Sequence, residues 1–125
     1  MGELKGKISE AKALVASGKA GIHFEWIAYH DALGVELHFE LPDLAVNKRL
    51  LKIFEQKKLE IEERVGEPIL FDHYFHKRWT RLLIRKATLG TETPPNLGDA
   101  TRQWGIETMA KLYTVCKPLV DGLKP

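Results

Sequence analysis

The chain has 125 residues, which suits one domain and leaves little room for a second. Hydrophobic residues make up 44% and charged residues 29%, which excludes wholesale disorder, and a net charge of +2 excludes a binder that depends on a strongly basic chain. No apolar run approaches the roughly 20 residues that a membrane span requires, and the N-terminus lacks the apolar core of a signal peptide. With Cys116 as its one cysteine, the chain cannot form an intramolecular disulfide. We therefore expect a single cytoplasmic domain over residues 1–125, without membrane association.

The first apolar pattern has helical spacing. Residues 3–17 repeat apolar side chains at intervals of three and four, and Gly18 and Gly21 follow directly. Since glycine commonly ends helices, this pattern predicts an N-terminal helix that stops at Gly18.

The period changes to two at residue 22. Apolar and polar residues alternate over 22–29 and again over 35–41, with a turn-like segment at 31–34 between them. A four-residue turn there would pair Phe24 with Leu41 on an apolar face and would place the polar residues on the opposite face.

A helix, a second hairpin and a last helix follow. The apolar stripe of residues 43–65 predicts one long helix, which Gly66 ends. Residues 69–74 and 79–84 pair well across a four-residue loop, because Asp72 then faces Arg81 and Tyr74 faces Trp79. The last helix would be capped by Asn96 and kinked or ended by Pro118, with Cys116 on its apolar face as a small core residue.

These segments predict an α+β domain with the order helix-strand-strand-helix-strand-strand-helix. Its two β-hairpins would form an antiparallel sheet, with helices packed on one face. The other face would carry too many apolar side chains for free exposure to water, so we expect a helix, a partner protein or a second copy of the chain to cover it. The candidate interface residues on that face are Tyr29, Tyr74, Trp79 and Leu83.

Positive charge is concentrated in the second hairpin. All five basic residues of the segment 67–90 lie within ten positions, and a tryptophan stands among them, which is a pattern that could meet phosphates and stack a base. The alternative is that the arginines neutralise Asp72, Glu25 and Glu40 across the sheet. The nucleic-acid-binding candidates are Lys77, Arg78, Trp79, Arg81, Arg85 and Lys86.

Metal and catalytic sites find less support in the sequence. The predicted hairpin puts both His23 and His38 on a face with glutamates, but no spacing matches a zinc signature, so we expect no metal and no cofactor. Asp31, Glu36 and His38 are too closely spaced for a nuclease layout, and no nucleophile or phosphate-loop motif is present. We therefore expect a protein that is not an enzyme.

Several stretches together resemble a prokaryotic family known as domain of unknown function 4268. They are residues 34–39, 47–71, 81–84 and 104–119, and the resemblance extends over about residues 20–120. Members of that family often lie at the C-terminus of longer proteins, some with nuclease-like or restriction-associated N-terminal regions. The resemblance implies an accessory or recognition module, and it implies no catalytic residues.

Two functional hypotheses follow. The first is a non-catalytic accessory or binding module that associates with nucleic acid, DNA for example, in a restriction- or nuclease-type setting. The second is a protein-interaction or self-association domain, which would form a homodimer or bind a partner protein through the apolar outer face.

Overall fold

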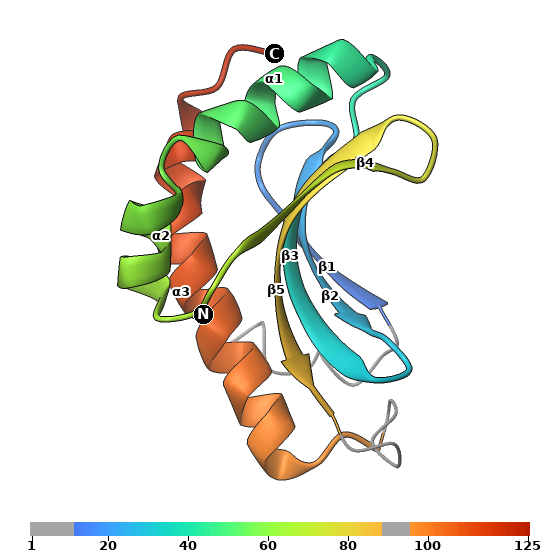
Figure 1. The fold of residues 1–125 in the computed structure, drawn as a ribbon, viewed down its shortest axis with the longest axis vertical. Coiled ribbons are helices and arrows are strands. Elements are labelled where there is room, and N and C mark those ends of the chain that lie inside the picture. Colours follow the sequence, from blue (N-terminus) through green and yellow to red (C-terminus); the bar gives the residue numbers. More distant parts are fainter. Residues whose placement is uncertain (1–11, 89–95) are drawn as a thin grey trace.

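A computed structural model of the protein describes residues 12–88 and 96–125. Its five strands form one antiparallel sheet in the order β1-β2-β3-β5-β4 (Figure 1). The elements are β1 (Lys12–Ala16), β2 (Ile22–Ala28), β3 (Ala32–Phe39), α1 (Leu44–Glu55), α2 (Lys58–Val65), β4 (Leu70–Phe75), β5 (Trp79–Ala87) and α3 (Asp99–Asp121).

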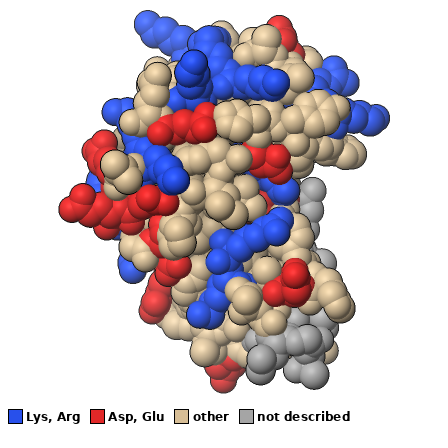
Figure 2. All heavy atoms as spheres, in the orientation of Figure 1, with Lys and Arg blue, Asp and Glu red and all other residues tan. Residues whose placement is uncertain are grey.

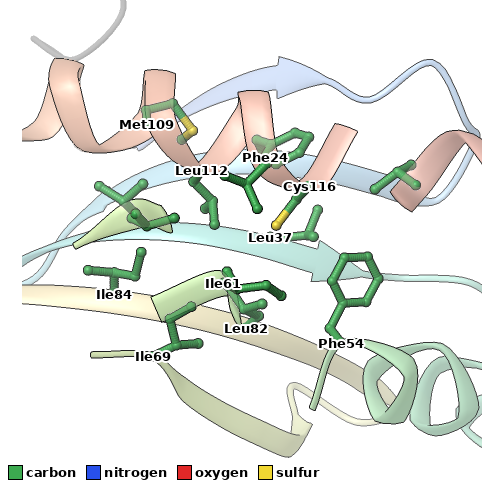
Figure 3. Packing of buried hydrophobic residues seen from close by; sticks show 14 of the residues in the cluster. Phe24, Leu37, Phe54, Ile61, Ile69, Leu82, Ile84, Met109, Leu112 and Cys116 are labelled. Carbon is green, nitrogen blue, oxygen red and sulfur yellow. The ribbon is translucent and has the colours of Figure 1, made fainter. Parts of the chain in front are cut away.

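The three helices lie on the same side of the sheet, and the hydrophobic core fills the space between them and the strands (Figure 1). Phe24 and Leu37 from the sheet meet Phe54 of α1 and Leu112 of α3 in this core (Figure 3). The buried indole of Trp26 donates to the backbone carbonyl of Gly105 at 2.9 Å, which ties β2 to α3. The α+β class and the antiparallel sheet are therefore confirmed.

The prediction of a helix over residues 3–17 is wrong for its described part. Residues 12–16 form β1, which pairs with β2, so the described part of the sheet has five strands and not the predicted four. Five residues of the sequence Lys-Ala-Leu-Val-Ala fit both periods, and the burial of Ala13 beside the exposed Leu14 is that of a strand. Residues 3–11 of that prediction lie outside the described residues.

The first hairpin keeps its predicted faces but not its predicted register. Phe24 pairs with Leu37 and not with Leu41, a shift of four residues along β3. Gly34, predicted in the turn, lies inside β3 in this register. A Cβ atom there would lie 2.8 Å from the ring of Tyr29 and closer still to the Glu36 carboxylate, so glycine allows a close approach of side chains.

The segment predicted as one helix is two. It breaks after Glu55 and restarts at Lys58, while Gly66 ends α2 with a φ of 83°, as expected. The last helix has Gly98 and not Asn96 as its N-cap, and α3 continues past Pro118 to Asp121.

The second hairpin follows its predicted register only at its base. Asp72 pairs with Arg81 as predicted, but an irregularity between Asp72 and Phe75 brings Phe75, in place of Tyr74, opposite Trp79. The turn that follows contains two non-glycine residues with positive φ, His76 at 40° and Lys77 at 74°. This turn projects at one end of the sheet, next to α1 (Figure 1).

Candidate functional site

Polar and charged side chains are buried on the outer face of the sheet, which we define as the face opposite the helices. The cross-strand pairs His23–His38 and Glu25–Glu36 of β2 and β3 both point there. Glu25, Glu36 and His38 are exposed by only 1%, 0% and 2%. With Glu40, which follows β3, these four residues form a set of five that we call the His–Glu cluster: His23, Glu25, Glu36, His38 and Glu40. The last helix, one of the expected covers, does not cover this face, because α3 packs on the opposite one.

His38 holds the centre of the cluster. Its Nε2 lies 2.7 Å from Glu36 Oε1 and its Nδ1 lies 2.8 Å from Glu40 Oε2. Burial alone would lower the pKa of His38, but the hydrogen bonds to these two carboxylates outweigh burial and raise the pKa above its ordinary value. When both ring nitrogens are protonated, His38 can donate to both glutamates.

Glu36 is fixed from a second side. It accepts hydrogen bonds from the hydroxyl of Tyr29 and, at 3.0 Å, from Nη1 of Arg81, which also pairs with Asp72. Burial would raise the pKa of Glu36, but the bonds from His38 and Tyr29 lower it, so the carboxylate stays charged. Burial and the adjacent carboxylate in turn raise the pKa of Tyr29 to about 12.

Four nitrogen and oxygen atoms of the cluster lie close enough together to hold a metal ion. They belong to His23, Glu25, His38 and Glu40, and all lie within 4.8 Å of one another. Alternation places these side chains on one face of the hairpin, so the sequence does group them. Their convergence depends on the observed register, which sets His23 directly opposite His38.

An aromatic chain connects the cluster to the β4–β5 turn. The ring of Phe75 meets His38 edge-on with centroids 4.9 Å apart, and the Arg81 guanidinium stacks on the same ring at 4.4 Å. Trp79 then contacts both Phe75 and His76, with centroids 6.0 and 4.8 Å away. Phe75 reaches His38 because of the register irregularity in β4, which the sequence does not reveal.

Beyond Trp79 lies a groove of about 340 Å³, which we call the basic groove. It runs between the end of β3 and the β4–β5 turn, and Arg78 donates to the Pro42 carbonyl across it at 3.1 Å. Glu40 belongs to both the groove and the His–Glu cluster, so the two features are contiguous. The lining residues are Glu40, Leu41, Pro42, His76, Lys77, Arg78 and Trp79.

The structure brings together only part of the predicted basic set. Lys77, Arg78 and Trp79 line the groove. Arg81 instead forms ion pairs with Glu36 and Asp72 on the sheet, and the pair with Asp72 was predicted by the alternative in which the arginines neutralise acidic residues. Arg85 stacks on Tyr29 at 4.2 Å. Lys86 lies over the ring of Trp104 in α3, at 5.7 Å, and so faces the helix side. The predicted basic residues therefore do not form one continuous surface along β5.

Helix α1 supplies cations that no sequence motif marked as part of the site. Lys48, Arg49 and Lys52 are exposed on it. The buried Asn47 fixes α1 to the groove, because its side chain bonds the backbone of Leu41 twice and the carbonyl of Arg78. Figure 2 shows Lys and Arg side chains gathered over the end formed by α1 and the β4–β5 turn. The helical stripe could have shown these lysines to be exposed, but not what they lie beside.

The predicted interface residues also separate. Leu83 is buried at 4% exposure and cannot present a docking surface, and Tyr29 is engaged by Glu36 and Arg85. Trp79 lies in the basic groove, and Tyr74 on the edge strand β4 is 57% exposed.

The chain belongs to the family described as domain of unknown function (DUF4268), whose model matches residues 10–120, as the resemblance implied. No curated protein matches the chain. Within residues 12–88 and 96–125, no helix is long and apolar enough to cross a membrane.

Proposed function

We propose that this chain is a nucleic-acid-binding module that holds the phosphate backbone in its basic groove and along the adjoining side of α1. The observation that carries the proposal is the pairing of exposed cations, Lys77 and Arg78, with the His76–Trp79 ring pair at one groove. Cations neutralise phosphates and release counterions, and an aromatic ring stacks a base irrespective of sequence.

Two features support the choice of this end of the molecule. The cations of α1 extend the basic surface beyond the groove, since Asn47 links the start of that helix to Arg78. Glu40 is the acidic residue that lines the groove. Its carboxylate is hydrogen-bonded to His38 at 2.8 Å, so its negative charge is partly compensated. Acidic side chains instead gather over α2 (Figure 2).

The test is fluorescence anisotropy with labelled single-stranded and duplex DNA at low and moderate salt. We expect affinity to fall steeply with salt, and the Lys77→Glu/Arg78→Glu variant to lose at least about tenfold in affinity with a salt slope smaller by roughly two. The matched control is Arg64→Glu/Lys111→Glu, which makes the same charge change at exposed helix positions away from the groove. Equal losses in both variants, or no binding at low salt, would contradict the proposal.

Self-association through β4 is the second candidate function. Its support is that β4 is an edge strand with two apolar side chains, Leu70 and Tyr74, each 57% exposed. A dimer formed there should persist at high salt, because apolar burial is not screened, and Tyr74→Asp should dissociate it. Light scattering after size exclusion separates the two outcomes; a monomer at high micromolar concentration would count against this candidate.

A further inference from the structure

We propose that His23, Glu25, His38 and Glu40 form a four-coordinate binding site for a divalent transition-metal ion of the zinc class. The site shares Glu40 with the basic groove but needs none of the groove cations, so it can be tested separately from the nucleic-acid proposal. It rests on the convergence of two imidazole nitrogens and two carboxylate oxygens within 4.8 Å.

The spacing of these atoms fits a tetrahedron. Zinc binds imidazole and carboxylate at about 2.0–2.2 Å, so adjacent ligands of a tetrahedral ion lie roughly 3.3–3.6 Å apart. His23 Nε2 lies 2.9 Å from Glu25 Oε1 and 3.4 Å from Glu40 Oε2. His38 Nδ1 lies 3.8 Å from the same Glu25 oxygen and 2.8 Å from the same Glu40 oxygen. These four distances bracket the tetrahedral value, and the other two ligand pairs are at most 4.8 Å apart, so side-chain shifts of up to about an ångström would place all four atoms on one ion.

The surroundings of His38 match those of a metal ligand. A ligating histidine usually donates its second ring nitrogen to a carboxylate, which fixes the tautomer and the ring orientation. His38 directs Nδ1 into the cluster and Nε2 to Glu36, at 2.7 Å. Glu36 is itself held by Tyr29 and Arg81, so the support extends one layer further.

The ligand set also selects the class of ion. Two imidazoles and two carboxylates suit zinc, cobalt, iron and similar ions, whereas magnesium and calcium require mostly oxygen ligands. Glu25 and His38 are buried, and the side chains of His23 and Glu40 are 20% and 16% exposed, which leaves a path from solvent on one side. Four protein ligands make this a site that stabilises the fold, with no step of chemistry assigned to the ion.

The test titrates tag-free, chelator-treated protein with Zn²⁺, Co²⁺ and Mg²⁺. We expect one equivalent of Zn²⁺ by calorimetry, the visible absorption of four-coordinate Co²⁺, and no saturable binding of Mg²⁺. A hundredfold excess of free Zn²⁺ over its Kd should raise the thermal midpoint by about 10 °C.

His23→Gln is the decisive variant, because this partly exposed ligand can change without emptying the buried centre. It should weaken Zn²⁺ binding by well over tenfold, while Tyr29→Phe, which leaves all four ligands in place, should cost about tenfold. The matched control is His73→Gln, since His73 forms a comparable bond to Glu55, at 3.0 Å, outside the cluster. Absence of saturable Zn²⁺ binding, or equal binding by His23→Gln and His73→Gln, would overturn the site and leave imidazolium–carboxylate pairing as the role of the cluster.

Discussion

The two faces of β3 are equally buried but are held by different forces. Val35 and Leu37 point to the helices and are fully enclosed by apolar side chains, while Glu36 and His38 point to the outer face and are enclosed by charged partners. Apolar burial is non-directional and scales with the area removed from water. A buried ion pair is favourable only while its partners stay in place. Substitutions that remove side-chain volume should therefore destabilise the protein on the helix side of β3. On the outer side, substitutions that remove a charged partner should destabilise it.

The largest expected effect is on the apolar side. Phe24 is fully buried against Tyr113 of α3, with ring centroids 5.0 Å apart. Phe24→Ala removes that ring from the core, and we expect it to lower the free energy of unfolding by about 3–5 kcal/mol. Urea denaturation followed by circular dichroism measures this change. A loss below about 1 kcal/mol would mean that the helices do not pack as described.

The next effect tests the polar side without a change in volume. Glu36→Gln keeps the shape of the side chain but removes the charge that faces His38 and Arg81. Since one partner of a buried ionic network is lost, we expect a cost of about 3 kcal/mol. Denaturation under metal-free conditions isolates this term from any bound ion.

The control for that variant is Glu63→Gln at an exposed position of α2. Its free energy of unfolding should stay within about 0.5 kcal/mol of the wild-type value. If the two variants were equally stable, directional partners would not hold the outer face, and the contrast between the faces would fail.

A smaller effect sharpens the comparison at the position where the outer face is most crowded. Gly34→Ala places a Cβ atom 2.8 Å from the Tyr29 ring and closer still to the Glu36 carboxylate. We expect a cost of about 1–3 kcal/mol, because both side chains must move from their hydrogen bond. Gly122→Ala, where the nearest atom lies at 3.6 Å, should be close to neutral. Thermal denaturation of the two variants would contradict this account if they shifted equally.

The smallest expected effect is an absence of reactivity on the apolar side. Burial raises the pKa of the Cys116 thiol to about 12, so the reactive thiolate is scarce at neutral pH. We expect an aromatic disulfide reagent at pH 8 to modify Cys116 only as fast as the protein unfolds, and promptly once denaturant is added. Rapid modification of the folded protein would show that the core around α3 opens readily.

Period-two alternation predicted which residues of β2 and β3 share a face, and it did so although the predicted register was four residues off. A register shift by an even number of residues preserves every face, so the pattern could not distinguish Leu37 from Leu41 as the partner of Phe24. The observed register also requires a residue without a Cβ atom at position 34, where Gly34 stands. In β1, five residues were too few to separate a helical period from a strand period.

The α+β class, the apolar faces of the helices and of the strands other than β1, and the grouping of His23, His38 and the glutamates on one face follow from the amino-acid sequence alone. These properties depend on local periodicity, which the chain carries in every short segment. Three further features depend on how the elements pack: four ligand atoms converge, Phe75 rests on His38, and Asn47 joins α1 to the basic groove. Each of these contacts joins residues from different turns or elements, and its geometry depends on register and packing.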